Sequence, residues 1–306
     1  MKIQKLLIIL VAVTLLGFFG VFSPAYSADT ADVIFVVDES GSMGGEHDWI
    51  GGMVTSLDTE LNNAGISGNQ YGLVGFGGST LGSHFDPHSH DTSGIGSPGT
   101  WLNAGGLSSA STTLVTSGGT EDGYLGIDWA INNYSFRSGA ATNFVLITDE
   151  DRDVANNNNL VKQDVLDALN NKNAQLNSVV NISFTDGDGN SALGIDSNST
   201  AYIEDGSGGF TSALGATIGS GFGTTEADYV DLALDTEGAA WDLNKLRSNN
   251  ATIANSFTEA FVDIKVGEIQ DQPGNGAPVP EPTTWMLLGT GLVAMLGLGR
   301  KKLLKK

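Results

Sequence analysis

The stretch VIFVVDESGSM, residues 33–43, decides the fold of this chain. Its first five residues are apolar and mostly β-branched, a pattern typical of a strand buried on both faces of a parallel sheet. One carboxylate and two hydroxyls then follow at alternate positions, Asp38, Ser40 and Ser42. In open α/β sheets, ligands bind beyond the carboxyl ends of the strands. Oxygen ligands at that position predict a site for a hard cation such as Mg²⁺ or Ca²⁺.

Alternating strands and helices continue from Asp29 to Ile269. We predict strands over residues 33–37, 71–76, 143–148 and 179–184, and helices over residues 49–61, 124–134, 161–169 and 253–264. This alternation predicts an α/β fold with a doubly wound, mostly parallel central sheet and helices on both faces. Two Gly-rich stretches, Thr80–Gly119 and Thr185–Tyr229, do not fit a minimal domain and are predicted to form loop or hairpin excursions, with a short strand candidate at Ala201–Ile203.

Three segments together resemble the metal-ion-dependent adhesion site of von Willebrand factor A (vWA) domains. They are Asp38-x-Ser40-x-Ser42, a Gly-rich loop that ends in Thr120 before a helix, and a later strand that ends in Asp149. A solvated strand-to-helix turn is the alternative for the first segment alone. The resemblance implies a vWA-like, Rossmann-like fold.

The resemblance also implies how a metal would be held. Ser40, Ser42 and Thr120 would supply hydroxyl ligands to Mg²⁺ (or Ca²⁺ or Mn²⁺), while Asp38 and Asp149 would bind directly or through water. With few direct charges on the metal, an acidic group of a partner can complete its coordination.

One feature departs from the family pattern. The family usually has Gly after the strand-end Asp, whereas this chain has Glu150, Asp151 and Asp153. These carboxylates could strengthen Ca²⁺ binding or weaken the attraction for an acidic ligand, so the departure concerns the ligand more than the metal.

The amino terminus has the features of a secretory signal peptide. Lys2 and Lys5 precede an apolar run over residues 6–21 and small residues over 23–28. We predict a signal peptide over residues 1–28, with cleavage near Ser27 or Ala28. An uncleaved anchor is the alternative.

The carboxyl terminus resembles a PEP-CTERM sorting signal. Beyond a predicted domain over residues 29–269 lies a Pro/Gly-rich linker, residues 270–282. Residues 279–306 combine Val-Pro-Glu-Pro, an apolar segment and a basic tail. The resemblance implies an exosortase-type sorting enzyme as partner and a transient stay in the inner membrane. It also implies export to the cell envelope, outer surface or extracellular matrix of a Gram-negative bacterium. An ordinary C-terminal anchor is the alternative.

Charge and cysteine content exclude several classes of function. Outside the two ends, 7 basic residues face 35 acidic ones, so residues 29–299 carry a net charge of about −28. Such a surface repels polyanions, and we predict no nucleic-acid partner. The chain has no cysteine, which rules out disulfides, thiolate metal sites and cysteine nucleophiles.

Two further groups of polar residues are candidate metal sites. His84, His88 and His90, with Asp86 and Asp91, offer ligands suited to Zn²⁺, although Pro87 and the lack of a helix favour a solvated loop. Asp186, Asp188 and Asn190 have the spacing of the start of a calcium loop. Ser191 and Ser197 stand where that loop requires Gly and Glu, which favours a hairpin turn, with Ca²⁺ binding as the alternative.

Little in the sequence supports catalysis. It contains neither a Gly-x-Ser-x-Gly elbow nor a phosphate-binding loop. Asp38 could be a phosphoryl-accepting nucleophile, but Ser40 stands where that class of phosphatase has a second acid. We therefore predict that the protein is not an enzyme. The predicted function is an exported, metal-dependent adhesion or binding module for an extracellular protein or polysaccharide. The alternatives are a Ca²⁺-stabilised structural matrix protein and, with less support, a hydrolase.

Overall fold

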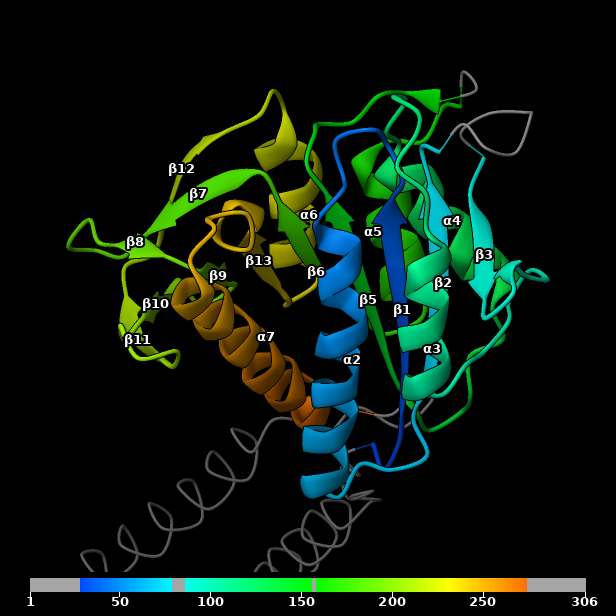
Figure 1. Cartoon of the computed structure of the whole chain (residues 1–306), viewed down its shortest axis with the longest axis horizontal. Coiled ribbons are helices and arrows are strands. Elements are labelled where there is room, and N and C mark those ends of the chain that lie inside the picture. Colours follow the sequence, from blue (N-terminus) through cyan, green and yellow to red (C-terminus); the bar gives the residue numbers. More distant parts are fainter. Residues whose placement is uncertain (1–27, 79–85, 156–157, 274–306) are drawn as a thin grey trace, which may run out of the picture. The chain divides into compact units, whose positions relative to one another are not determined.

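Strand β1 (Ala31–Asp38) lies in the middle of a ten-stranded sheet, and all eight of its residues are buried. It pairs in parallel with β2 (Gln70–Phe76) on one side and with β5 (Ala141–Thr148) on the other. Strands β6 (Ala174–Val180) and β13 (Ala239–Asp242) continue the parallel region beyond β5 (Figure 1). Because the strand order reverses direction at β1, the sheet is doubly wound, and the predicted fold class is confirmed.

The computed structural model describes residues 28–78, 86–155 and 158–273. The predicted signal peptide, apart from Ala28, and the predicted sorting signal over residues 279–306 lie outside the described residues, as does His84. None of the described helices is long and apolar enough to cross a membrane.

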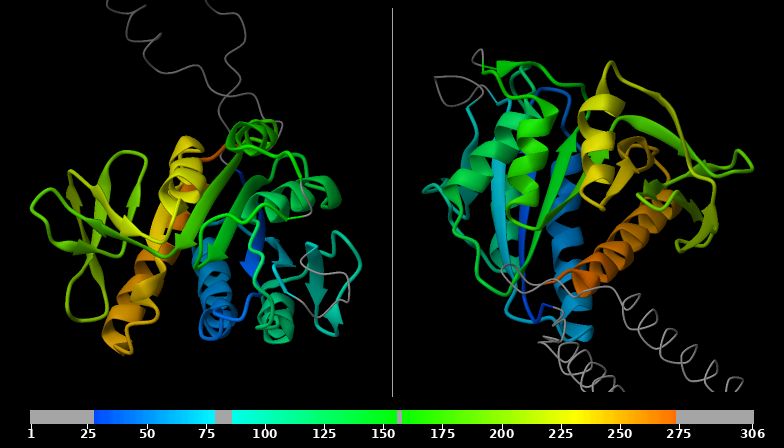
Figure 2. Two further views of the ribbon diagram at one scale, coloured as in Figure 1. Left: turned by 90° about the horizontal axis from the view of Figure 1, so that it is seen from above. Right: turned by 180° about the vertical axis from the view of Figure 1, so that it is seen from behind.

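Helices cover both faces of the sheet (Figure 2). One face carries α2 (Glu46–Asn63), α3 (Ala104–Ala110) and α7 (Ala251–Asp271), and the other carries α4 (Gly123–Asn133), α5 (Lys162–Asn170) and α6 (Asp231–Asp235). Side chains of β1 alternate between the two cores: Val33, Phe35 and Val37 face one, and Ile34 and Val36 face the other. Burial on both faces explains why the strand has no polar residue between Asp32 and Asp38.

The first Gly-rich stretch is more ordered than predicted. It contains a hairpin of β3 (His88–Asp91) and β4 (Gly94–Ile95), with β3 antiparallel to β2, and then α3 and the 3₁₀ helix η1 (Ser111–Thr113). The predicted hairpin is confirmed, but the helix was missed. Glycines and serines give α3 a poor intrinsic helix propensity. It is helical because Asn103 caps it, accepting a bond from the Gly106 N–H at 2.7 Å, and because its apolar residues pack on the sheet.

The predicted single strand over residues 179–184 is wrong, because the run forms two strands. Strand β6 ends at Val180 and β7 (Ile182–Thr185) begins a separate three-stranded sheet with β8 (Ser191–Ala192) and β12 (Thr217–Gly221). Both strands are largely buried, so hydrophobicity does not reveal the break at Asn181.

The second Gly-rich stretch forms short hairpins beside α7. Strands β9 (Gly194–Asp196), β10 (Thr200–Glu204) and β11 (Phe210–Leu214) extend the main sheet as an antiparallel edge. Asp186, Asp196 and Asp205 each begin a hairpin turn in which the carboxylate accepts bonds from the N–H groups two and four residues later. The hairpin interpretation of the Asp186 loop is confirmed. A π-helical turn, η3 (Glu226–Val230), leads into α6, and the 3₁₀ helix η4 (Leu243–Lys245) follows β13.

The domain extends beyond its predicted end at Ile269. Helix α7 continues to Asp271, and the buried Gln272 side chain accepts a bond from Asn143 Nδ2 at 2.7 Å and donates one to the Thr142 carbonyl at 2.9 Å. The predicted linker start at residue 270 therefore lies within the folded domain, because these polar contacts extend the helix past its apolar stripe.

We expect Gln272→Ala to lower the free energy of unfolding by about 1–3 kcal/mol, because it leaves buried partners of β5 without hydrogen bonds. Equilibrium urea denaturation measures the change. Gln270→Ala is the matched control, since Gln270 is exposed on the same helix. Equal effects of the two substitutions would contradict the anchoring role of Gln272.

Candidate metal-binding site

The site is built on the buried carboxylate of Asp38 at the end of β1. One oxygen, Oδ1, accepts a bond from the Ser40 N–H at 2.7 Å, and Oδ2 accepts one from the Thr148 hydroxyl at 2.9 Å. His47 Nε2 lies 2.8 Å from the Asp38 carbonyl oxygen. These contacts fix the carboxylate between the ends of β1 and β5, where the sequence predicts it.

Three of the other predicted residues join Asp38 in one hydrogen-bonded group. The Ser40 and Ser42 hydroxyl oxygens lie 3.0 Å apart, and the Ser42 hydroxyl donates to Asp149 Oδ1 at 2.9 Å. Asp38, Ser40 and Asp149 are buried. The structure thus brings together side chains that are more than a hundred positions apart in sequence.

Thr120 lies in the adjoining loop. The Gly41 N–H donates to the Gly118 carbonyl at 3.3 Å, which places this loop beside the first one. Gly77 has a φ of +77°, and a Cβ there would lie 3.2 Å from Asp38 Oδ1 and 3.3 Å from the Thr120 carbonyl oxygen. The main chain of Thr120 is therefore close to Asp38. Among the described residues, none hydrogen-bonds to its hydroxyl, and its role as a ligand stays a prediction.

Glu121 is a site residue that the sequence analysis missed. Ligand oxygens of Asp38, Glu121 and Asp149 all lie within 4.8 Å of one another, and all three residues are buried. Glu121 Oε2 is buried without a hydrogen-bond partner among the described residues. Burial and the charge of Asp38 raise the pKa of Glu121 to about 9, and burial also raises the pKa of Asp38.

The next residue, Asp122, turns away from the site and fixes the loop. It accepts bonds from the Leu125 N–H at 3.3 Å, which caps α4, and from Arg152 Nε at 2.7 Å. The Asp153 N–H donates to the Glu121 carbonyl at 2.8 Å. Glu121 and Asp122 are thus neighbours in sequence, but the backbone directs the Glu121 side chain into the site and the Asp122 side chain away from it.

In the acidic run after Asp149, Asp151 has a structural use. Asp151 Oδ2 accepts bonds from the Thr224 N–H at 3.0 Å and from its hydroxyl at 3.1 Å, and so anchors the segment before η3. Asp153 is exposed.

Arg247 supplies a positive charge beside the cluster, and the sequence analysis assigned it no role there. Its Nη1 donates to Asp149 Oδ2 at 2.8 Å, and its Nε pairs with Glu46. Its Nη2 also donates to the Ser42 carbonyl at 3.3 Å. The side chain is 30% exposed, so the guanidinium both holds Asp149 and faces solvent.

The donor set fits a hard divalent cation. It consists of carboxylate and hydroxyl oxygens, which are the ligands that Mg²⁺ and Ca²⁺ prefer. The unpaired Oε2 of Glu121 and the raised pKa values show that the protein alone does not compensate this concentration of negative charge.

The predicted histidine group is assembled in part. His88 and His90 lie on β3, with side chains against Glu39 rather than in solvent. Asp91 does not join them, because its carboxylate accepts bonds from the N–H and hydroxyl of Ser93. The solvated-loop interpretation is therefore wrong for His88 and His90.

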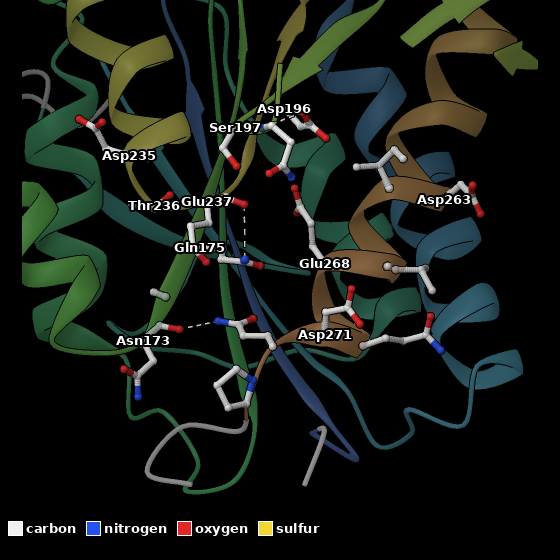
Figure 3. Close-up of a pocket in the computed structure, with 18 of the residues that line it drawn as sticks. Asn173, Gln175, Asp196, Ser197, Asp235, Thr236, Glu237, Asp263, Glu268 and Asp271 are labelled. Atoms are coloured by element: carbon white, nitrogen blue, oxygen red, sulfur yellow. Dashed lines mark hydrogen bonds between the residues drawn. The ribbon is translucent and has the colours of Figure 1, made fainter. Parts of the chain in front are cut away.

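A separate groove of about 1100 Å³ lies near the start of β6 and the end of α7 (Figure 3). Its labelled acidic side chains are Asp196, Asp235, Glu237, Asp263, Glu268 and Asp271. Neither Asp38, Glu121 nor Asp149 is among the residues that line it. The groove lies at the edge where the parallel strands begin, whereas the candidate site lies where they end.

A family profile described as the PEP-CTERM protein-sorting motif matches residues 278–302. The chain carries a PEP-CTERM motif. The predicted sorting signal is thereby confirmed, and PEP-CTERM signals mark proteins for export to the surface of Gram-negative bacteria. The motif also implies recognition by an exosortase.

Solved structures show distant similarity. An aerotolerance-related membrane protein from Bacteroides fragilis, solved with multiple mutations to serines, is 13% identical, with 78% of this chain and 99% of that chain covered and a TM-score of 0.39. The conserved hypothetical protein BatB from Bacteroides thetaiotaomicron is 16% identical, with 76% and 98% covered and a TM-score of 0.38. Proximal thread matrix protein 1 from the mussel byssus is 14% identical, with 51% and 37% covered and a TM-score of 0.35. A search of curated proteins returns no match. The fold class rests on the sheet order itself.

We expect the stability of the metal-free protein to depend on pH through Glu121. Its pKa is about 9 in the folded state against an ordinary value of 4.5, so the folded state binds the proton more tightly. Stability is therefore lost as the pH rises from about 4.5 towards 9. Glu121→Gln removes this dependence, so its melting temperature in chelator should exceed that of the wild type more at pH 8.5 than at pH 5.

Glu226→Gln is the control, because Glu226 is exposed. Its difference from the wild type should stay the same at both pH values. A Glu121→Gln difference that does not change with pH would contradict the burial of an ionisable carboxyl at this position.

Proposed function

We propose that this protein, marked for export by its sorting motif, is a metal-dependent binding module. The observation that carries the proposal is the convergence of the Asp38, Glu121 and Asp149 carboxylates within 4.8 Å at the end of the central strands. Asp38, Ser40, Ser42, Thr120 and Asp149 would hold Mg²⁺, or Ca²⁺ or Mn²⁺, with Glu121 as an additional carboxylate.

Charge balance supports a cation here. Among the residues that the structure describes, Arg247 is the one Lys or Arg side chain that forms an ion pair with this cluster. Of the three carboxylates, it pairs only with Asp149. Asp38 and Glu121 must otherwise share a proton, as their raised pKa values indicate. A divalent cation bound between the carboxylates would offset that repulsion directly.

One cationic side chain beside the site supports an acidic ligand, although it already pairs with Glu46 and Asp149. The Arg247 guanidinium is partly exposed and adjoins Ser42 and Asp149. A guanidinium binds carboxylates through several parallel hydrogen bonds. We propose that a carboxylate of an extracellular protein or acidic polysaccharide completes the coordination of the metal and pairs with Arg247.

Two alternatives follow from the same geometry. A structural matrix protein would use Ca²⁺ only for rigidity, and would gain stability from the metal without binding a partner through it. A hydrolase would need a nucleophile and a base in addition to the metal. That the protein is not an enzyme stays a prediction, as do its transient stay in the inner membrane and its final place on the surface or in the matrix.

Metal binding is tested by thermal unfolding of the chelator-treated protein with and without millimolar Mg²⁺ or Ca²⁺. A ligand that binds only the folded state at 100 times its Kd stabilises by about 2.7 kcal/mol, so the wild type should melt several degrees higher with metal. Asp38→Ala should abolish this shift, and Asp153→Ala, which removes a nearby exposed carboxylate, should retain it. A shift that survives in Asp38→Ala would refute the site.

Partner binding is tested by a pull-down from extracellular polymer, with and without chelator. We expect the wild type and Asp153→Ala to retain material that chelator releases, and Asp38→Ala to retain none of it. If all three proteins retain the same material, the structural alternative is favoured over adhesion.

The role of Arg247 can be separated from metal binding. We expect Arg247→Gln to keep the metal-dependent melting shift but to lower the affinity for a carboxylate partner about tenfold or more, because a charge-assisted contact is lost. Lys245→Gln, which removes a positive charge two residues earlier, is the control. Pull-down yields at increasing salt give the comparison, and equal yields for the two variants would remove Arg247 from the ligand site.

A further inference from the structure

A second convergent cluster lies next to the first, on the other side of β1. Glu39 follows Asp38 in sequence, and its buried carboxylate meets the two histidines of β3. His88 Nε2 lies 3.0 Å from Glu39 Oε2, and His90 Nε2 lies 3.2 Å from Oε1. The two Nε2 atoms lie 3.0 Å from each other. Residues two apart on a strand share a face, so β3 presents both rings to the same point.

The opposite ring nitrogens fix the tautomers. His90 Nδ1 lies 2.8 Å from the Thr113 hydroxyl oxygen, and that hydroxyl donates its own proton to the Ala110 carbonyl at 2.7 Å. His88 Nδ1 lies 3.0 Å from the Asp86 carbonyl, which only accepts. Both Nδ1 atoms therefore carry a proton, so each ring, when neutral, directs an Nε2 lone pair inwards.

With both rings neutral, none of the three side chains Glu39, His88 and His90 donates a hydrogen bond to the centre of the cluster. Two Nε2 lone pairs and the carboxylate oxygens of Glu39 converge, and Glu39 Oε2 accepts no hydrogen bond in the part of the chain that the structure describes. Either additional protons on the rings or one metal ion must relieve this repulsion.

We propose that Glu39, His88 and His90 form a second metal site, for Zn²⁺ or a similar divalent transition metal, which goes beyond the proposed adhesion function. Imidazole nitrogen with a carboxylate selects such metals over Mg²⁺. Tetrahedral Zn²⁺ with bonds of about 2.0–2.1 Å sets its ligand atoms roughly 3.3 Å apart. The two Nε2 atoms are 3.0 Å apart, each lies 3.0–3.2 Å from one of the two Glu39 oxygens, and one ligand atom from each residue lies within 4.8 Å of the others.

The neighbouring strand leaves room for this cluster. Gly75 of β2 lies opposite His88 in the sheet register. A Cβ at Gly75 would clash with Glu39 Oε2 and lie 2.9 Å from His90 Nε2. The Thr113 and Asp86 contacts are of the kind that orient metal-ligating histidines through the other ring nitrogen.

Occupation of the second site would also hold the loop that leads to Thr120. Glu39 Oε1 accepts a bond from the Val115 N–H at 2.8 Å, and the Glu39 carbonyl accepts one from the Ser117 N–H at 2.9 Å. The ligand set thus connects β1, β3 and this loop.

The test is a Co²⁺ and Zn²⁺ titration of the chelator-stripped full chain in excess Mg²⁺, which keeps the first site filled. We expect the wild type to bind one Co²⁺ with visible absorption bands typical of nitrogen ligation, and Zn²⁺ to displace it. His90→Gln should weaken binding at least 100-fold. Thr113→Val, which touches no ligand atom of the metal, should weaken it about 10–100-fold. Asp149→Asn, in the first site, should bind Co²⁺ as the wild type does.

A wild type that binds no Co²⁺ or Zn²⁺ in excess Mg²⁺ would overturn the proposal and leave a protonated Glu–His pair. Binding unchanged in both His90→Gln and Thr113→Val would overturn it as well. If His90→Gln does not fold, Thr113→Val decides alone. Loss of binding in Asp149→Asn would assign the Co²⁺ to the first site and also overturn the proposal. Because the Mg²⁺ melting shift is measured separately, failure here leaves the proposed function standing.

Discussion

The two polar clusters of this protein depend on one constraint: two consecutive carboxylates, Asp38 and Glu39, lie at the end of a strand that is buried on both faces. Successive side chains of a strand point to opposite faces, so Asp38 and Glu39 enter different environments although they are neighbours in sequence. Asp38 meets hydroxyls and other carboxylates, and Glu39 meets imidazoles. Neither carboxylate can be solvated where it lies. Buried charge of this kind must be compensated by protons, cations or hydrogen bonds. The residues around Asp38 and Glu39 provide hydrogen bonds, and both clusters could also hold protons or a cation.

The fold could be predicted because its signals are local. The apolar run before Asp38 and the helical stripes depend on burial patterns that a sequence displays directly. Helix α3 could not be predicted in this way, since its stability comes from the Asn103 cap and from packing rather than from propensity. The break at Asn181 was hidden for a related reason, because the strands on either side of it are both buried.

The candidate site could be predicted only where its residues belong to the strand-end pattern. Asp38, Ser40, Ser42 and Asp149 come together as the first and third segments of the resemblance imply. Glu121 and Arg247 could not be recognised, because their roles depend on the path of two loops that meet in three dimensions. In a chain with 35 acidic residues, the type of residue alone does not distinguish Glu121, which enters the site, from Asp122, which turns away to cap a helix.

Helix α7 connects the two ends of the central strand β5. Its 21 residues span about 30 Å. Arg247, shortly before its first turn, contacts Asp149 at the end of β5, and Gln272, after its last turn, contacts residues near the start of β5. The described domain ends at Pro273, so this end and the candidate metal site lie at opposite ends of the helix. If the carboxyl terminus were held at a surface while the proposed site bound a partner, tension would run along α7 and β5 in parallel. The apolar packing between helix and sheet, rather than a single loop, would bear the load.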